Sequence, residues 1–241
     1  MTAFVREHYY YLVMIFTIGY SLAFVFFLSG RLQYSRTAKK FSYFLIVVSG
    51  WAFKDSLAEM LLPYFDQAAF MRVVGVLSAL FLCIPVFAFD MLAAVYNAFV
   101  PGERQFTRTA QVRYALAGTL LGTYVVTLID PRFMYLNLTF LHGTYVYDPG
   151  PGLIMFALSL VLTSGVLAAS IIHVSWKDRR SEAFFIGMGA LITLGVSLAT
   201  NIVPSWIGLG DLPRLGCVSM FLLSGMTFYA IKRYGRIFPV S

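Results

Sequence analysis

Apolar residues occur in seven long stretches, each bounded by charged residues, proline or glycine. A helix of about 20 apolar residues crosses the roughly 30 Å hydrocarbon core of a bilayer, so each stretch is long enough to span a membrane. The runs lack the two-residue alternation of membrane β-strands. The pattern therefore predicts an all-α membrane protein, a seven-transmembrane helix bundle that forms a single domain over residues 1–241. The spans cover about 8–29, 41–63, 68–98, 109–129, 151–175, 183–203 and 213–232.

Two of these regions carry further local signals. The third stretch contains Pro85, which predicts a tilted or kinked helix because proline lacks the N–H that a regular helix uses. The longest connection, residues 130–150, has two β-rich runs, 133–139 and 144–147, around His142-Gly143. This arrangement predicts a short β-hairpin or lid over the helix ends.

The composition supports the membrane assignment and excludes an ordinary soluble domain. The chain is 59% hydrophobic and 12% charged, with a mean hydropathy of +0.78, whereas soluble domains carry about 25% charged residues. Its two cysteines are too few for a disulfide scaffold or a multi-cysteine metal site. The lipid bilayer is therefore the first predicted partner.

The basic residues predict the orientation. Lysine and arginine gather on the cytoplasmic side of membrane proteins. Thirteen of the 18 fall in the connections after the first, third and fifth spans and after the seventh, which requires an odd number of helices. We therefore predict a multi-pass protein of the inner (cell) membrane, with the amino terminus outside and the carboxyl terminus in the cytoplasm. Topology accounts for the net charge of +7 without a nucleic-acid partner.

Several charges fall inside the predicted outer halves of the spans, where each costs at least about 2.5–3.5 kcal/mol near the membrane centre. Such charges usually face the bundle interior or a watery cavity. They predict a ligand-binding site formed by Lys54, Asp55, Glu59, Arg72, Asn201 and Arg214. Within it, Arg72 is the expected partner of Asp55 or Glu59. A structural ion-pair network and a proton or ion path remain the alternatives.

Asp90 is a separate, deeper charge. It lies eighteen residues after Arg72, which is five helical turns or about 27 Å, so the two do not pair. We expect Asp90 to contact a cytoplasmic-side cation, either Arg113 or Lys232. This contact either sets the register of the helices or couples a signal between states.

Sequence patterns for catalysis are missing. The chain has no His-Glu-x-x-His, Gly-x-Ser-x-Gly or phosphate-binding glycine loop, and its three histidines lack the i, i+4 spacing of a metal site. We therefore expect no enzyme activity, no cofactor and no metal. Gly118 and Gly122 have the spacing of close helix contacts, which we expect within the molecule, with a homodimer seam as the alternative.

Several segments in the carboxyl half of the chain resemble those of a known family. The residues that carry this resemblance are Ile129-Asp-Pro-Arg-Phe133, Tyr145-Val-Tyr-Asp-Pro-Gly-Pro-Gly152, Asn201-Ile-Val-Pro204, Ile207-Gly-Leu-Gly-Asp-Leu-Pro213, Phe221-Leu-Leu-Ser-Gly225 and Ala230-Ile-Lys-Arg-Tyr-Gly-Arg-Ile-Phe238. With them, the chain resembles the amino-terminal seven-helix sensor region of bacterial histidine kinases, the receptors of two-component systems. In that family the seventh helix leads into a cytoplasmic sensor, kinase or cyclase domain, and residues 1–241 contain none.

The resemblance implies signal reception. An extracellular or membrane-borne small molecule or peptide would change the packing of the helices, and the seventh helix would pass the change to a cytoplasmic output domain or partner kinase. A small seven-helix transporter is the alternative, although no repeat of two three-helix halves is evident. An assembly subunit that binds a stoichiometric partner is a third interpretation.

Overall fold

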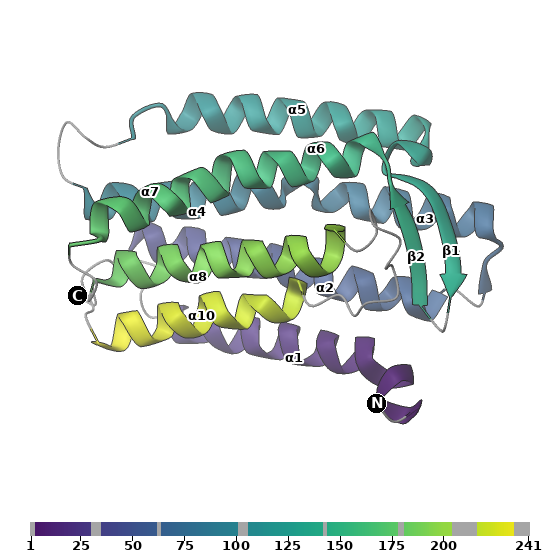
Figure 1. The fold of residues 1–241 in the computed structure, drawn as a ribbon, viewed down its shortest axis with the longest axis horizontal. Coiled ribbons are helices and arrows are strands. Elements are labelled where there is room, and N and C mark those ends of the chain that lie inside the picture. Colours follow the sequence, from purple (N-terminus) through teal and green to yellow (C-terminus); the bar gives the residue numbers. More distant parts are fainter. Residues whose placement is uncertain are drawn as a thin grey trace.

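The computed structural model describes residues 3–29, 35–61, 64–100, 106–141, 144–177, 181–203 and 216–233, with most of their side chains. Over these residues the chain is mostly helical, and its helices form seven rods that run side by side (Figure 1). The rods are α1 (Ala3–Ser29), α2 (Arg36–Leu61), α3 with α4 (Gln67–Leu80 and Ile84–Phe99), α5 (Thr109–Ile129), α6 with α7 (Pro151–Ser159 and Val166–Ser175), α8 (Glu182–Ser197) and α10 (Gly216–Arg233). The predicted all-α fold is confirmed, and rod boundaries lie close to those of the predicted spans.

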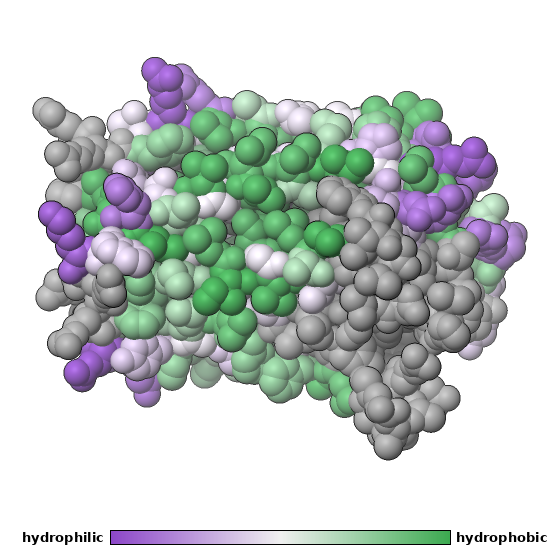
Figure 2. All heavy atoms as spheres, viewed as in Figure 1, coloured by the Kyte–Doolittle hydropathy of each residue, from purple (hydrophilic) through white to green (hydrophobic). Residues whose placement is uncertain are grey.

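Within the part of the chain that the structure describes, four rods are long and apolar enough to cross a membrane. They cover Gln67–Phe99, Thr109–Ile129, Pro151–Ser175 and Glu182–Thr200, and Ile15–Ser29 is a shorter apolar helix. Figure 2 shows a hydrophobic band around the middle of the visible face and hydrophilic residues at both ends. A band of this kind matches the hydrocarbon layer of a bilayer.

Three of the rods contain irregular turns. A 3₁₀ turn, η2 (Phe81–Cys83), separates α3 from α4, and Pro85 lies in the first turn of α4, so the helix is irregular where the sequence predicts a tilted or kinked helix. Two π-turns, η5 (Leu160–Gly165) between α6 and α7 and η6 (Leu198–Ile202) after α8, were not predicted. π-Turns widen a helix locally and are frequent at functional sites.

The predicted hairpin is present. Strands β1 (Tyr135–Leu141) and β2 (Thr144–Pro149) pair antiparallel and lie across one end of the rods, here named the hairpin end (Figure 1). Gln67 Nε2 donates a hydrogen bond to the Leu138 carbonyl at 2.6 Å, which joins the start of α3 to the hairpin. At the hairpin base a Cβ on Gly150 would lie 2.4 Å from the Phe133 carbonyl oxygen, so only glycine fits there.

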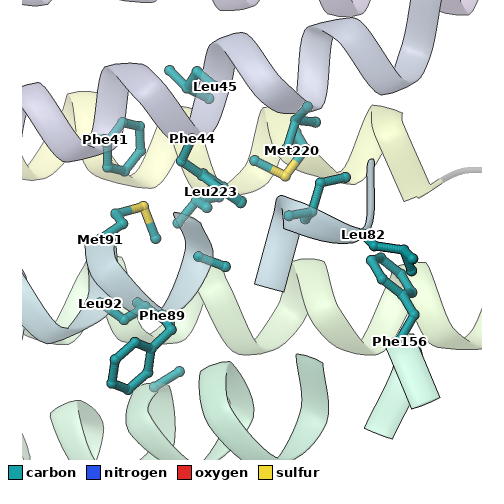
Figure 3. Close-up of a cluster of buried hydrophobic side chains, with 14 of the residues drawn as sticks. Phe41, Phe44, Leu45, Leu82, Phe89, Met91, Leu92, Phe156, Met220 and Leu223 are labelled. Atoms are coloured by element: carbon teal, nitrogen blue, oxygen red, sulfur yellow. The ribbon is translucent and has the colours of Figure 1, made fainter. Parts of the chain in front are cut away.

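The core lies where α2, α4, α6, α8 and α10 meet. Figure 3 shows Phe44, Met91 and Leu223 gathered at the meeting of α2, α4 and α10. A Cβ on Gly189 would lie 3.1 Å from the Leu223 Cα, so α8 and α10 pack closely through this glycine. Gly118 and Gly122 are exposed, and a Cβ on either would meet nothing within 4 Å. The expectation that these two glycines pack within the molecule is therefore wrong, and the homodimer seam stays a prediction.

Candidate functional site

Lys54 is the charge most completely removed from solvent at the hairpin end. It lies on α2 and is 3% exposed. Its Nζ forms an ion pair with Asp55, donates a hydrogen bond to Ser78 Oγ of α3 at 3.1 Å and lies 4.6 Å from the centre of the Trp51 ring. A buried ammonium is stable only when paired and hydrogen-bonded, and these contacts supply both requirements.

The hairpin extends the same network. Tyr135 at the start of β1 is buried, and its hydroxyl donates to Ser78 Oγ at 2.8 Å. Tyr135 also contacts Tyr147 of β2 edge to face, with 4.9 Å between the ring centres. Ser78 thus receives hydrogen bonds from both α2 and the hairpin, and the hairpin is part of the bundle interior rather than a loop above it.

Beside this network lies a cavity of about 140 Å³. Its walls come from α2, α4, the hairpin, α6 with η5, α8 with η6, and α10. The lining is mostly apolar and strongly aromatic. The aromatic members are Phe44, Trp51, Tyr135, Tyr147 and Phe156, and the rings of Trp51 and Phe156 stack 5.5 Å apart.

A few polar side chains also line the cavity: Asp55, Ser164, Thr193 and Ser197. Two of them hold α8 to α10. Thr193 Oγ1 donates to the Ser219 carbonyl at 2.9 Å, and Ser197 Oγ lies 3.2 Å from Ser219 Oγ. We name these contacts of Thr193, Ser197 and Ser219 the α8–α10 clasp. Part of the cavity wall is therefore formed by two side chains, Thr193 and Ser197, that hold α8 to α10.

The structure brings together only part of the predicted ligand site. Asp55 lines the cavity. Lys54 is not part of the cavity lining, but it forms an ion pair with Asp55. We expected Arg72 to pair with Asp55 or Glu59. Within the described residues Asp55 forms its ion pair with Lys54 and Arg72 is exposed on α3, while the pair of Arg72 with Glu59 stays a prediction. The side chains of Glu59 and Asn201, and the whole of Arg214, lie outside the described residues.

Asp90 forms a second charged cluster at the other end of the rods. Its Oδ2 lies 3.5 Å from Arg113 Nη1 of α5 and 3.5 Å from Lys40 Nζ of α2. The predicted contact with Arg113 is confirmed, and Lys40 is an additional partner. Lys232, the other predicted candidate, has its Nζ 5.3 Å from the centre of the Phe228 ring. The role of this cluster in signal coupling remains a prediction.

The apolar and hydroxyl members of the cavity were missed at the sequence level. A sequence of apolar spans offers no signal for which of its many phenylalanines, leucines and serines converge on one point. Trp51 was the exception that could have been found, because it lies one helical turn before Lys54 and shares its face.

Comparisons with known proteins leave the family open. No family model, no curated protein and no solved structure matches the chain. The resemblance to the sensor region of histidine kinases therefore stays a prediction.

Proposed function

We propose that this chain is a seven-transmembrane signal-receptor domain. A small molecule enters the cavity beneath the hairpin, changes the packing of α10 against α8, and α10 passes this shift to a cytoplasmic output such as a histidine kinase. The amino terminus lies outside and the carboxyl terminus in the cytoplasm. The resemblance described above points to the same function.

The observation that carries the proposal is the place of α10 in the cavity wall. Met220 and Leu223 of α10 line the cavity, and so do the Thr193 and Ser197 side chains of the α8–α10 clasp. A molecule in the cavity touches α10 directly and competes with the bonds that hold it. A ligand shifts an equilibrium only by binding one state better than the other, and contacts of this kind provide that difference.

The distribution of basic residues supports the orientation. In the described residues, the end of the rods opposite the hairpin carries Arg36, Lys39, Lys40, Arg108, Arg113, Lys177, Lys232 and Arg233. The hairpin end carries Arg6, Lys54, Arg72 and Arg132. By the positive-inside rule, the end with Arg233 faces the cytoplasm, so α10 delivers its shift to the side where an output domain would lie.

Filling the cavity permanently tests the coupling. Ala190 of α8 lines the cavity, and Ala190→Leu places a larger side chain there. Spin labels at Gln111→Cys and Lys232→Cys, in a background with Cys83 and Cys217 replaced by alanine, report the distance from the start of α5 to the end of α10. We expect Ala190→Leu to shift this distance on the order of 1–2 Å.

Two controls make the result specific. Ala169→Leu adds the same side chain at an exposed position of α7, and it should leave the distance unchanged. A second label pair, Gln111→Cys with Lys177→Cys, reports the end of α7 and should not respond to Ala190→Leu. If α10 does not move, or if both label pairs shift equally, the coupling through α10 is wrong.

A photocrosslinking residue at Arg233 tests the output. In living cells it should crosslink to a cytoplasmic signalling protein or to an output domain of the same polypeptide. The same residue at Tyr114, which is 68% exposed on α5, serves as the control and should not capture that protein. Equal capture from both positions would contradict delivery through α10.

A further inference from the structure

The size of the cavity limits its occupant. At about 140 Å³ it is close to an engineered apolar cavity of about 150 Å³ that binds benzene. A peptide does not fit this space, whereas a molecule of one aromatic ring does. The buried side chains of Leu92 of α4 and Phe156 of α6 are among its walls.

The charges around the cavity favour a neutral occupant. The one ionised side chain in its described lining is Asp55, and the ammonium group of Lys54 already pairs with that carboxylate. A cationic molecule would have to displace Lys54, which is 3% exposed and would be left as a buried, uncompensated charge. An anionic molecule would face the Asp55 carboxylate within a mostly apolar wall.

One polar group in the wall is unused. Ser164 is 6% exposed and lines the cavity, and its Oγ has no hydrogen-bond partner among the described residues. Several serines and threonines of these helices donate to the carbonyl four residues earlier, as Thr163 does to Ser159 at 2.5 Å, whereas Thr17, Ser42 and Ser224 resemble Ser164 in having no such partner in the described residues. Leaving a buried hydroxyl unpaired costs free energy, so a ligand group that pairs with it gains affinity.

The π-turn gives Ser164 this position. Ser164 belongs to η5, and Leu160 of the same turn also lines the cavity. In a π-turn the backbone bonds run to the fifth residue instead of the fourth, which rotates the following side chains relative to a regular helix. Ser164 and Leu160 of this turn thus both lie in the cavity wall.

We propose that the cavity binds a neutral molecule of about one aromatic ring that carries a single hydrogen-bonding group, and that Ser164 Oγ is the partner of that group. This inference rests on the proposed receptor function, for which it names the class of ligand. It narrows the sequence prediction of a small molecule or peptide to small aromatic alcohols, phenols and compounds of similar size.

The test compares two probes that differ in one group. The probes 4-fluorophenol and 4-fluorotoluene have the same ring, but only the first carries a hydroxyl. The full chain is placed in lipid nanodiscs, and binding is followed by fluorine NMR. Nanodiscs with the Ala190→Leu variant, in which the cavity is filled, supply the background for partition into lipid.

We expect saturable binding of both probes to the wild-type protein above that background, with 4-fluorophenol the tighter. Ser164→Ala should weaken the affinity for 4-fluorophenol about three- to tenfold, which is the usual contribution of one hydrogen bond. The same variant should leave the affinity for 4-fluorotoluene unchanged. Ser170→Ala, at a serine of α7 outside the cavity lining, is the matched control and should change neither affinity.

Other results would overturn the proposal. Equal binding to the wild-type and Ala190→Leu proteins would mean that the probes only dissolve in lipid. If Ser164→Ala lowered the affinity for both probes equally, Ser164 would be a packing residue and not a hydrogen-bond partner of the ligand. Thermal unfolding of each variant identifies any that fails to fold, and Leu194→Phe, at another cavity position, then replaces Ala190→Leu.

The two proposals fail in different ways. If the probes bind through Ser164 but the spin-label distance of α10 does not change, the ligand class stands and the receptor function falls. If α10 responds to cavity filling but neither probe binds, the receptor function stands and the ligand class is wrong.

Discussion

Tyr135 and Ser78 lie 57 positions apart in the chain, and the Tyr135 hydroxyl donates a hydrogen bond to Ser78 Oγ at 2.8 Å. Because Lys54 Nζ donates to the same oxygen at 3.1 Å, one serine joins α2, α3 and the hairpin. At 1.5 Å per residue, Ser78 lies about 17 Å along its rod from Gln67. The hairpin is therefore anchored well inside the bundle.

Tyr135→Phe removes one of these hydrogen bonds and keeps the ring in place. We expect it to lower the free energy of unfolding by about 1 kcal/mol. Thermal unfolding in detergent micelles measures the effect. Tyr64→Phe is the control, because Tyr64 is 82% exposed, and it should stay within about 0.5 kcal/mol of the wild type. Equal effects of the two variants would mean that the Tyr135 hydrogen bond contributes nothing.

The Lys54–Asp55 pair should behave as a unit. Lys54→Met removes the buried ammonium group from the pair, and we expect a loss of about 3–5 kcal/mol of stability. The double variant Lys54→Met with Asp55→Leu should recover most of that loss. Chemical denaturation of the wild type, the single variants Lys54→Met and Asp55→Leu, and the double variant in mixed micelles gives the coupling energy of the pair.

Arg72→Met provides the contrast for that pair. Arg72 is exposed, so its replacement should change stability by no more than about 0.5 kcal/mol. A loss as large as that of Lys54→Met would restore the sequence prediction that Arg72 belongs to the buried network.

Asp90 should contribute a salt-dependent share of stability. Its partners, Lys40 and Arg113, have side chains 18% and 36% exposed, and salt screens such pairs, with a Debye length that falls from about 10 Å at 0.1 M to about 3 Å at 1 M. We expect Asp90→Asn to lower the melting temperature at low salt and to have a smaller effect at high salt. Lys39→Gln, at an exposed position beside Lys40, is the control. A salt-independent effect would contradict the electrostatic role.

Two glycines of α8 should respond to alanine in opposite directions. Gly189→Ala places a Cβ 3.1 Å from the Leu223 Cα, and we expect it to destabilise the protein by about 1–3 kcal/mol because α10 must move. Gly195→Ala meets nothing within 4 Å, and it should stabilise the helix by about 0.5–1 kcal/mol. Thermal unfolding compares the two. Equal signs would mean that the close approach of α8 and α10 does not limit stability.

The rods and the hairpin could be predicted because their signals are strong and local. Twenty apolar residues in a row specify a helix in a membrane without knowledge of the neighbours, and β-branched and aromatic runs around His142-Gly143 specify a hairpin. The Asp90–Arg113 contact was predictable because the two residues lie at the same depth on spans that are adjacent in sequence.

The candidate site was harder to predict because it depends on side-chain reach and on irregular turns. Neighbours at i and i+1 do not usually face each other on a helix, so Arg72 seemed the better partner for Asp55. The long Lys54 side chain bends back and forms that pair itself. The π-turn that contains Ser164 changes the helix by a single residue, and the sequence of residues 160–165, Leu-Val-Leu-Thr-Ser-Gly, carries no sign of it.

The hairpin also connects several of the rods to one another. Gln67 and Tyr135 join α3 to the strands through hydrogen bonds, and the hairpin is continuous in the chain with α5 and α6. Helices α3, α5 and α6 are therefore all connected to the hairpin at one end of the bundle. Helix α10 is held at its sides, by the Thr193 contact with α8 and by the stacking of Tyr20 of α1 on Phe221. A change at the hairpin base therefore reaches α3, α5 and α6 together.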